Sequence, residues 1–126
     1  MKLFGRYLLE KGKITRIDII RARELQRMHN KSFFEIVLEK GFMKKEDIAR
    51  VQTIQEETNK PFEDIAVHEG IITSLMRDKI IDEMERNHMY FGEALVINGA
   101  ISKEELIKEL KEFNLMVIKE QMKEGR

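Results

Sequence analysis

Four glycines, each 29 residues from the next, are the feature of this sequence that most restricts its fold. The chain has only seven glycines, so this spacing is not plausible as chance. A phenylalanine keeps the same interval, eight positions before each glycine, and an apolar residue follows each glycine by two. The glycines are Gly12, Gly41, Gly70 and Gly99, and the phenylalanines are Phe4, Phe33, Phe62 and Phe91. The sequence is therefore a tandem repeat whose units stabilise one another by stacking.

Each repeat predicts a short helix, a glycine turn and a longer helix. Apolar residues before the glycine recur at helical intervals, as at Phe4, Leu8 and Leu9. Glycine ends a helix well because its backbone enters the left-handed region without a Cβ clash. Three residues later, a hydroxyl side chain can cap the next helix in three repeats, at Thr15, Thr73 and Ser102. We therefore expect an all-α fold of four tandem helix–turn–helix repeats, packed as two pairs.

The repeats cover residues of about 3–31, 32–60, 61–89 and 90–118, within a single helical domain of residues 1–126. The only proline, Pro61, opens the third repeat, and its polar neighbours suggest a division into two lobes near residues 59–61. A helix of about nine residues is marginal alone, so we expect the repeats to bury a shared core. The predicted core contains the four phenylalanines with Leu8, Ile14, Ile19, Val37, Met43, Ile48, Ala66, Ile72, Leu95, Ile101 and Leu106.

Composition narrows the class of function. Positive and negative residues cancel, at 23 each, so no global field attracts a nucleic acid. The chain has no cysteine, which excludes disulfides and thiolate chemistry. No apolar run approaches the roughly 20 residues that span a bilayer, and the N-terminal apolar run is too short for a signal peptide. We expect a cytoplasmic protein that neither enters a membrane nor binds nucleic acid.

No motif for catalysis or metal binding is present. His29, His68 and His88 share no helical i, i+3 or i, i+4 spacing. Carboxylate pairs stand among lysines and arginines, where helix capping and i, i+4 ion pairs explain them. An arginine cluster around Arg21 and Arg23 either holds a phosphate or forms salt bridges with nearby glutamates. We therefore predict that the protein is not an enzyme, with no catalytic residue and no metal site.

The repeats resemble a helical motif in the N-terminal domains of bacterial type II secretion and type IV pilus assembly ATPases. That motif opens on arginine and continues with an early glycine, an aliphatic pair, a turn glycine and a terminal glutamine, in tandem copies at the same interval. The first repeat keeps Gly5, Gly12 and Gln26, and the second keeps Gly41 and Gln55. The positions of the opening arginine are occupied by Leu3, Ser32, Pro61 and Tyr90.

The resemblance implies two alternative functions. The first is a non-enzymatic protein-interaction or regulatory module whose partner protein belongs to a secretion, pilus or signalling system. The alternative is a cyclic di-GMP sensor through the first two repeats, because in the MshEN branch a pair of motifs binds this nucleotide. Arg6, one helical turn beyond the missing arginine, then supplies the cation. The candidate nucleotide-binding residues are Gly5, Arg6, Gly12, Gln26, Gly41 and Gln55. No other cofactor is expected.

Overall fold

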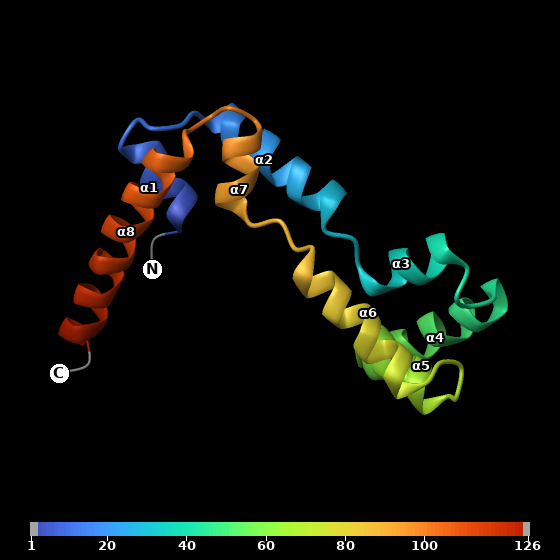
Figure 1. Ribbon diagram of the computed structural model, residues 1–126. Helices are drawn as coiled ribbons and strands as arrows, with labels where there is room; N and C mark the ends of the chain where they lie inside the picture. The colour runs from blue at the N-terminus through green and yellow to red at the C-terminus, as the bar shows by residue number, and fades with distance from the viewer. Residues whose placement is uncertain (1–2, 125–126) are drawn as a thin grey trace. The chain divides into compact units, whose positions relative to one another are not determined.

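The computed structural model describes residues 3–124, and all the regular structure within them is α-helical (Figure 1). The all-α prediction is therefore confirmed. Eight helices follow one another along this part of the chain. They are α1 (Phe4–Glu10), α2 (Arg16–His29), α3 (Phe33–Lys40), α4 (Lys45–Thr58), α5 (Phe62–His68), α6 (Ser74–Arg86), α7 (Phe91–Ile97) and α8 (Lys103–Glu124). Within the described residues, no helix combines the length and apolar character that a membrane crossing requires.

The turn glycines separate each short helix from the longer one that follows. Gly12, Gly41, Gly70 and Gly99 all have a positive φ, between 65° and 76°. A Cβ atom added at any of them would meet no atom within 4 Å. Glycine is therefore needed here for its backbone conformation and not for close packing. The start of α2 is fixed as well, because Asp18 N–H donates to Thr15 Oγ1 and Thr15 N–H donates to Asp18 Oδ2.

The chain forms two compact units, and they pair the repeats in a nested order. Residues 1–28 and 89–126 make up the first, called here the terminal unit, and residues 29–88 make up the second, called the inserted unit. The first repeat therefore packs with the fourth, and the second packs with the third. In the inserted unit, α5 packs against α3, α4 and α6, and in the terminal unit α8 packs against α1 and α7 (Figure 1).

The sequence suggested a division near residues 59–61, but the two units meet instead between residues 28 and 29 and between residues 88 and 89. Asn59 has a φ of 57° and ends α4, and Pro61 at φ −60° is the N-cap of α5. The polar segment is thus a tight turn that folds α5 back onto α4 inside one unit. Left-handed asparagine and proline are both common in such turns, which is why the same residues can resemble a boundary.

Each unit has its own apolar core. Most of the predicted core positions are buried, among them Leu8 and Leu95 in the terminal unit and Val37 and Ala66 in the inserted unit, all at 0% exposure. Phe4, Ile19 and Phe91 are only half-buried, although they pack against the terminal core. The expected core thus exists, but as two separate clusters.

The ends of the inserted unit meet. His29 Nε2 donates to the carbonyl oxygen of Asn87 at 2.7 Å, across 58 residues of chain. In the terminal unit, Gln26 Nε2 donates to the carbonyl oxygen of Met89 at 3.3 Å. The chain passes between the units twice, near residue 28 and near residue 88. Each unit therefore holds its own ends of these two connections together by a hydrogen bond.

Candidate functional site

The six candidate nucleotide-binding residues are divided between the two units. The terminal unit contains Gly5, Arg6, Gly12 and Gln26, and the inserted unit contains Gly41 and Gln55. Arg6 is 74% exposed and forms an i, i+4 ion pair with Glu10 at 3.3 Å. Gly5 is buried, and a Cβ atom there would lie 3.2 Å from the ring of Phe91. Gly5 and Arg6 therefore have structural contacts of their own, and the first two repeats do not share a compact unit.

Gln55 is the candidate that lines a cavity. This cavity, of about 400 Å³, lies in the inserted unit and is lined by Ser32, Phe33, Phe34, Gln52, Gln55, Pro61, Phe62 and Glu63. Ser32 and Pro61 occupy the two positions of the opening arginine, and Phe34 and Glu63 occupy those of the early glycine. The lining has no basic side chain and one carboxylate, which does not favour an anionic nucleotide.

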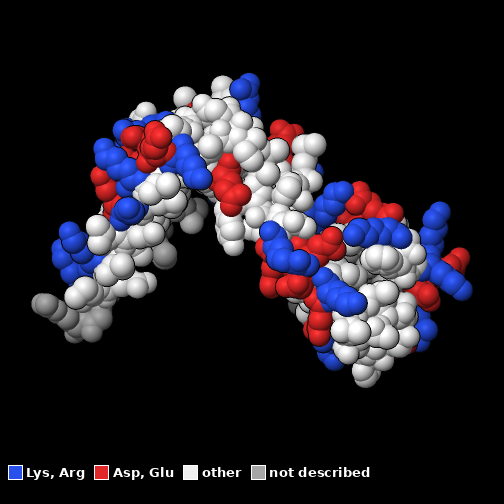
Figure 2. Space-filling model, viewed as in Figure 1, with Lys and Arg blue, Asp and Glu red and all other residues white. Residues whose placement is uncertain are grey.

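One arginine of the cluster in the first repeat, Arg23, has a packing role in the structure. The guanidinium carbon of Arg23 lies 4.6 Å from the centre of the Phe91 ring. This cation–π contact joins α2 to α7 within the terminal unit. Charges of both signs are intermixed over the visible face in Figure 2, without a large basic area. Among the residues placed in the structure, no three His, Asp or Glu side chains are grouped so that they could hold a metal ion.

A buried carboxylate is the least expected feature of the terminal unit. Glu109 has a side chain that is 1% exposed, and it is the one buried charged residue within residues 3–124. The corresponding positions of the other repeats, 29 residues apart, hold Ala22, Val51 and Ile80, which are all buried. The fourth repeat therefore carries a charge at a core position. The sequence contained this signal, because the four positions share the repeat interval.

Lys11 neutralises this carboxylate. Its Nζ donates to Glu109 Oε2 at 2.7 Å and to Glu112 Oε2 at 2.9 Å. Lys13 forms a parallel pair with Glu105 at 2.6 Å. These five residues, called here the lysine–glutamate cluster, join the end of α1 and the following turn to α8. Residues almost 100 positions apart thus form the charged contact between the first and the fourth repeat.

Four residues of the cluster have shifted pKa values that favour their charged forms. The hydrogen bonds that Lys11 donates, first to Glu109 and then to Glu112, raise its pKa, and the hydrogen bond that Lys13 donates to Glu105 raises the pKa of Lys13. Lys13 lowers the pKa of Glu105, and Lys11 lowers that of Glu112. A nucleophilic lysine needs a lowered pKa, and a general acid needs a raised carboxyl pKa. The shifts have the opposite direction, which is typical of a structural ion-pair network.

The terminal unit is expected to lose stability in acid. Because the pKa values of Glu105 and Glu112 are lowered, their contribution is fully present above the ordinary value of 4.5 and is lost as the pH falls through the folded values. The raised pKa of Lys13 has the opposite consequence: its contribution to stability is fully present below the ordinary value of 10.5 and is lost only as the pH rises above it. Thermal melts between pH 6 and about pH 3 test this. Lys13→Gln should make the melting temperature depend less on pH in this range. An unchanged dependence would show that the pair of Lys13 and Glu105 does not contribute to the loss of stability in acid.

The inserted unit carries a second surface feature, an apolar groove. It has a volume of about 400 Å³ and is called here the α6 groove, lined by Phe42, Thr73, Leu75, Met76, Lys79, Ile80 and Glu83. Leu75 is 65% exposed and Phe42 is 42% exposed, while Ile80 is buried at 4%. Large apolar side chains therefore stand at the surface above a core residue, in an arrangement that other proteins use to bind partners. No motif in the sequence indicated this groove, although Phe42 directly follows a turn glycine where the first repeat has Lys13.

Two lysines and one glutamate flank the α6 groove. Lys40 Nζ lies 3.6 Å from Glu83 Oε2 and 5.9 Å from the centre of the Phe42 ring. Lys79 is exposed, and no ion pair of its ammonium group is found within residues 3–124. The groove therefore has an apolar floor and a rim with a net positive charge.

Comparisons of the chain with protein-family models, with curated proteins and with solved structures found no match. The resemblance to the secretion and pilus ATPase domains consequently depends on the motif residues alone.

Proposed function

We propose that this chain is a non-enzymatic protein-interaction module that binds a helix of a partner protein in the α6 groove. The observation that carries the proposal is the exposure of Leu75 and Phe42 beside the buried Ile80. Exposing these side chains leaves apolar area in water that a partner can cover, at roughly 25 cal/mol per Å². A small groove of this kind fits the apolar face of a short amphipathic helix.

The rim charges indicate the chemistry of that helix. Lys79 is an exposed ammonium group beside the groove, and Lys40 is only partly engaged, because its 3.6 Å pair with Glu83 is long and exposed. Acidic residues next to the inserted apolar side chains would be attracted to both lysines. The proposed occupant is therefore an amphipathic helix with leucine or phenylalanine on one face and glutamate or aspartate beside it.

A pair of synthetic helices tests this proposal on the full chain. The first is a leucine-rich amphipathic peptide with glutamate flanks, and the second has the same leucines with lysine flanks. We expect the acidic peptide to bind with a Kd on the order of 100 µM and to shift the NMR signals of Phe42, Leu75 and Met76. Leu75→Glu should weaken binding at least about tenfold. Equal binding of both peptides, or shifts that map elsewhere, would overturn the proposal.

From the resemblance to the secretion and pilus ATPase domains, we propose that the partner protein belongs to a secretion or pilus system. Cyclic di-GMP is the alternative ligand. The position of Gln55 in a cavity supports the alternative, whereas Glu63 in the same lining opposes it. Isothermal titration with cyclic di-GMP separates the two functions. Heat of binding that Arg6→Ala abolishes would support the nucleotide sensor through its displaced arginine. The interaction module predicts no heat with this nucleotide.

A further inference from the structure

The second half of α8, called here the extension, is mostly exposed: Met116 and Val117 are half-buried, and the other residues from 114 to 123 are exposed. α8 has 22 residues, whereas α2 and α4 have 14 each and α6 has 13. The last aromatic contact between α8 and α1 is made by Phe113, whose ring centre lies 5.3 Å from Phe4 and 5.2 Å from Tyr7. The helix then continues for about three turns, and a helical segment of that length is marginal in water without a partner.

This extension carries an apolar stripe on its exposed side. Leu115, Ile118 and Met122 are 58%, 53% and 67% exposed. Their spacing of three and four residues is that of the seam between two packed helices, and Lys111 extends the same line toward the N-terminus. At 100° per residue, this stripe lies on the opposite side of α8 from buried Glu109. The extension is therefore amphipathic, with its apolar side turned away from the terminal core.

The flanking charges match those of an identical helix in one antiparallel register. If Leu115 packs against Ile118 of the second copy, the two-fold axis passes between Met116 and Val117. Glu112 then lies on the same edge of the seam as Lys119 of the second copy, two positions from the residue directly opposite, and the same diagonal pair forms again across the axis. Met122 would cover the alkyl stem of Lys111 of the second copy.

Two other arrangements, one antiparallel and one parallel, lack these charge pairs. Antiparallel pairing of Ile118 with Ile118 of the second copy brings the two Lys119 side chains together, which is repulsive. In a parallel pair, Glu112 would lie beside apolar Ile107 and would meet no lysine. The sequence of the extension thus favours one arrangement of two copies.

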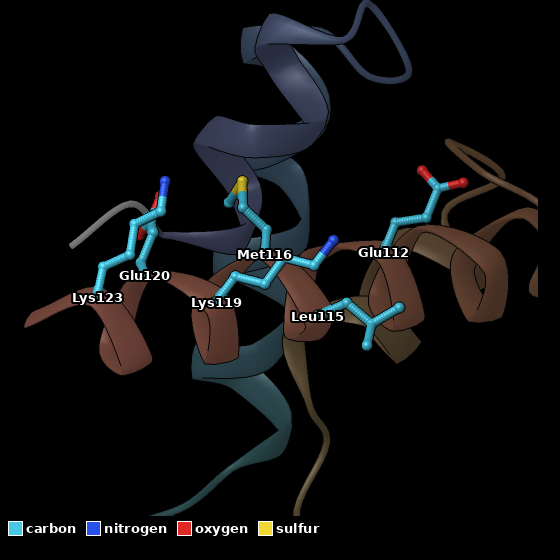
Figure 3. Close-up of a pocket in the computed structure, with 6 residues that line it drawn as sticks. All are labelled: Glu112, Leu115, Met116, Lys119, Glu120 and Lys123. Carbon is cyan, nitrogen blue, oxygen red and sulfur yellow. The ribbon is translucent and has the colours of Figure 1, made fainter. Parts of the chain in front are cut away.

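Both members of the charge pair are accessible. Figure 3 shows Glu112 and Lys119 on the same side of α8, on either side of Leu115. They line a shallow hollow of about 490 Å³, formed by α8 side chains alone, together with Leu115, Met116, Glu120 and Lys123. Glu112 is 45% exposed, and its bonds to Lys11 and Tyr7 both use Oε2. Its Oε1 can therefore accept from Lys119 of a second copy.

We propose that the chain pairs with a second copy of itself through the antiparallel stripes of Leu115, Ile118 and Met122. The seam is shorter than two heptads, so it buries far less than the about 1,200 Å² of a standard stable interface. The dimer is consequently weak, with a Kd on the order of 100 µM, and it forms only at high local concentration. This surface belongs to the terminal unit and does not depend on the α6 groove.

Sedimentation of the full chain tests the association. Between about 10 µM and about 1 mM, the average mass should rise from 15.0 kDa toward twice that value. The double variant Leu115→Glu with Ile118→Glu should stay monomeric. Leu75→Glu is the matched control on the inserted unit, and it should dimerise as the parent does. A monomer at about 1 mM, or a Leu115→Glu, Ile118→Glu variant that still dimerises, would refute the proposal.

The register has its own test, because the chain contains no cysteine. Asn114 and Gln121 of the second copy lie diagonally across the other edge of the proposed seam, outside its apolar centre. An oxidised equal mixture of Asn114→Cys and Gln121→Cys should give mainly the mixed disulfide. A predominance of 114–114 links would indicate a parallel pair and contradict the proposal. Lys119→Glu should weaken the dimer about fivefold or more while Lys119→Arg retains it; equal affinities would contradict the proposed register, which depends on the pair of Glu112 and Lys119.

Discussion

Leu95→Ala is expected to lower the free energy of unfolding of the terminal unit by about 3–5 kcal/mol while the inserted unit stays folded. Leu95 is fully buried in the terminal core, and no residue of the inserted core is in that cluster. The loss includes both the transfer of the deleted methyl groups and the cavity that remains. A loss of that size is a large fraction of the total stability of a small domain.

Residue-resolved amide hydrogen exchange measures this effect in both units of the full chain. Amides of α7 and α8 should exchange faster in Leu95→Ala, and those of α4 and α5 should keep their protection. Val37→Ala is the matched control, because Val37 occupies the same repeat position in the inserted unit and is also fully buried. It should have the converse effect. Equal loss of protection in both units would show that the two cores unfold as one.

Lys11→Met is expected to lower the melting temperature of the terminal unit by roughly 5–10 °C. The methionine removes the cation but keeps most of the side-chain volume, so Glu109 is left buried and without its ammonium partner. An uncompensated buried charge is among the most destabilising changes in a folded protein.

Glu109→Leu gives the decisive comparison. The other repeats hold apolar residues at this position, and Lys11 keeps its bond to Glu112 and its partial exposure when Glu109 is replaced. The single variant Glu109→Leu should therefore be neutral or stabilising, and it should cancel most of the damage of Lys11→Met in the double variant. Additive effects in thermal melts of the four proteins would mean that Lys11 and Glu109 are not coupled.

The positions of the helices follow from local signals in the sequence. The turn glycines, the helix caps and the apolar spacing act over a few residues, so each helix can be recognised within its own repeat. The buried positions follow for the same reason, because the burial of Leu8, Val37, Ala66 and Leu95 depends on the face of a helix and not on the identity of its neighbour.

The pairing of the repeats could not be derived in this way. Every repeat has a similar apolar face, so the periodic residues fit several pairings equally well. Residues that differ between repeats make the distinction, such as Lys11 with Glu109 and the ring contact of Phe4 with Phe113. These pairs become recognisable only once the first and fourth repeats are placed together. Phe113 and Glu109 stand where other repeats have Gln26 and Val51, so the departures from the repeat carry the information.

The surface that a partner would bind could not be derived from the motif, for a related reason. The motif residues Gly12 and Gly41 maintain turns, and Gln26 binds a backbone carbonyl group. Such residues identify the scaffold, whereas a surface for a partner depends on the residues that vary from repeat to repeat. The groove around Phe42 and Leu75 is made of such residues.

The nested pairing of repeats has a consequence for synthesis on the ribosome. The inserted unit is complete once residue 88 has emerged, so it can fold from contacts that are close in sequence. The first repeat must wait for the fourth, and at about 5–20 residues per second that delay lasts several seconds or more. During this time the apolar side of α1 is without its partner, and a chaperone that binds short apolar segments would find it there. The hydrogen bond between His29 and Asn87 joins the two ends of the inserted unit, so folding of that unit would leave residue 89 near the end of the first repeat before the last helices are made.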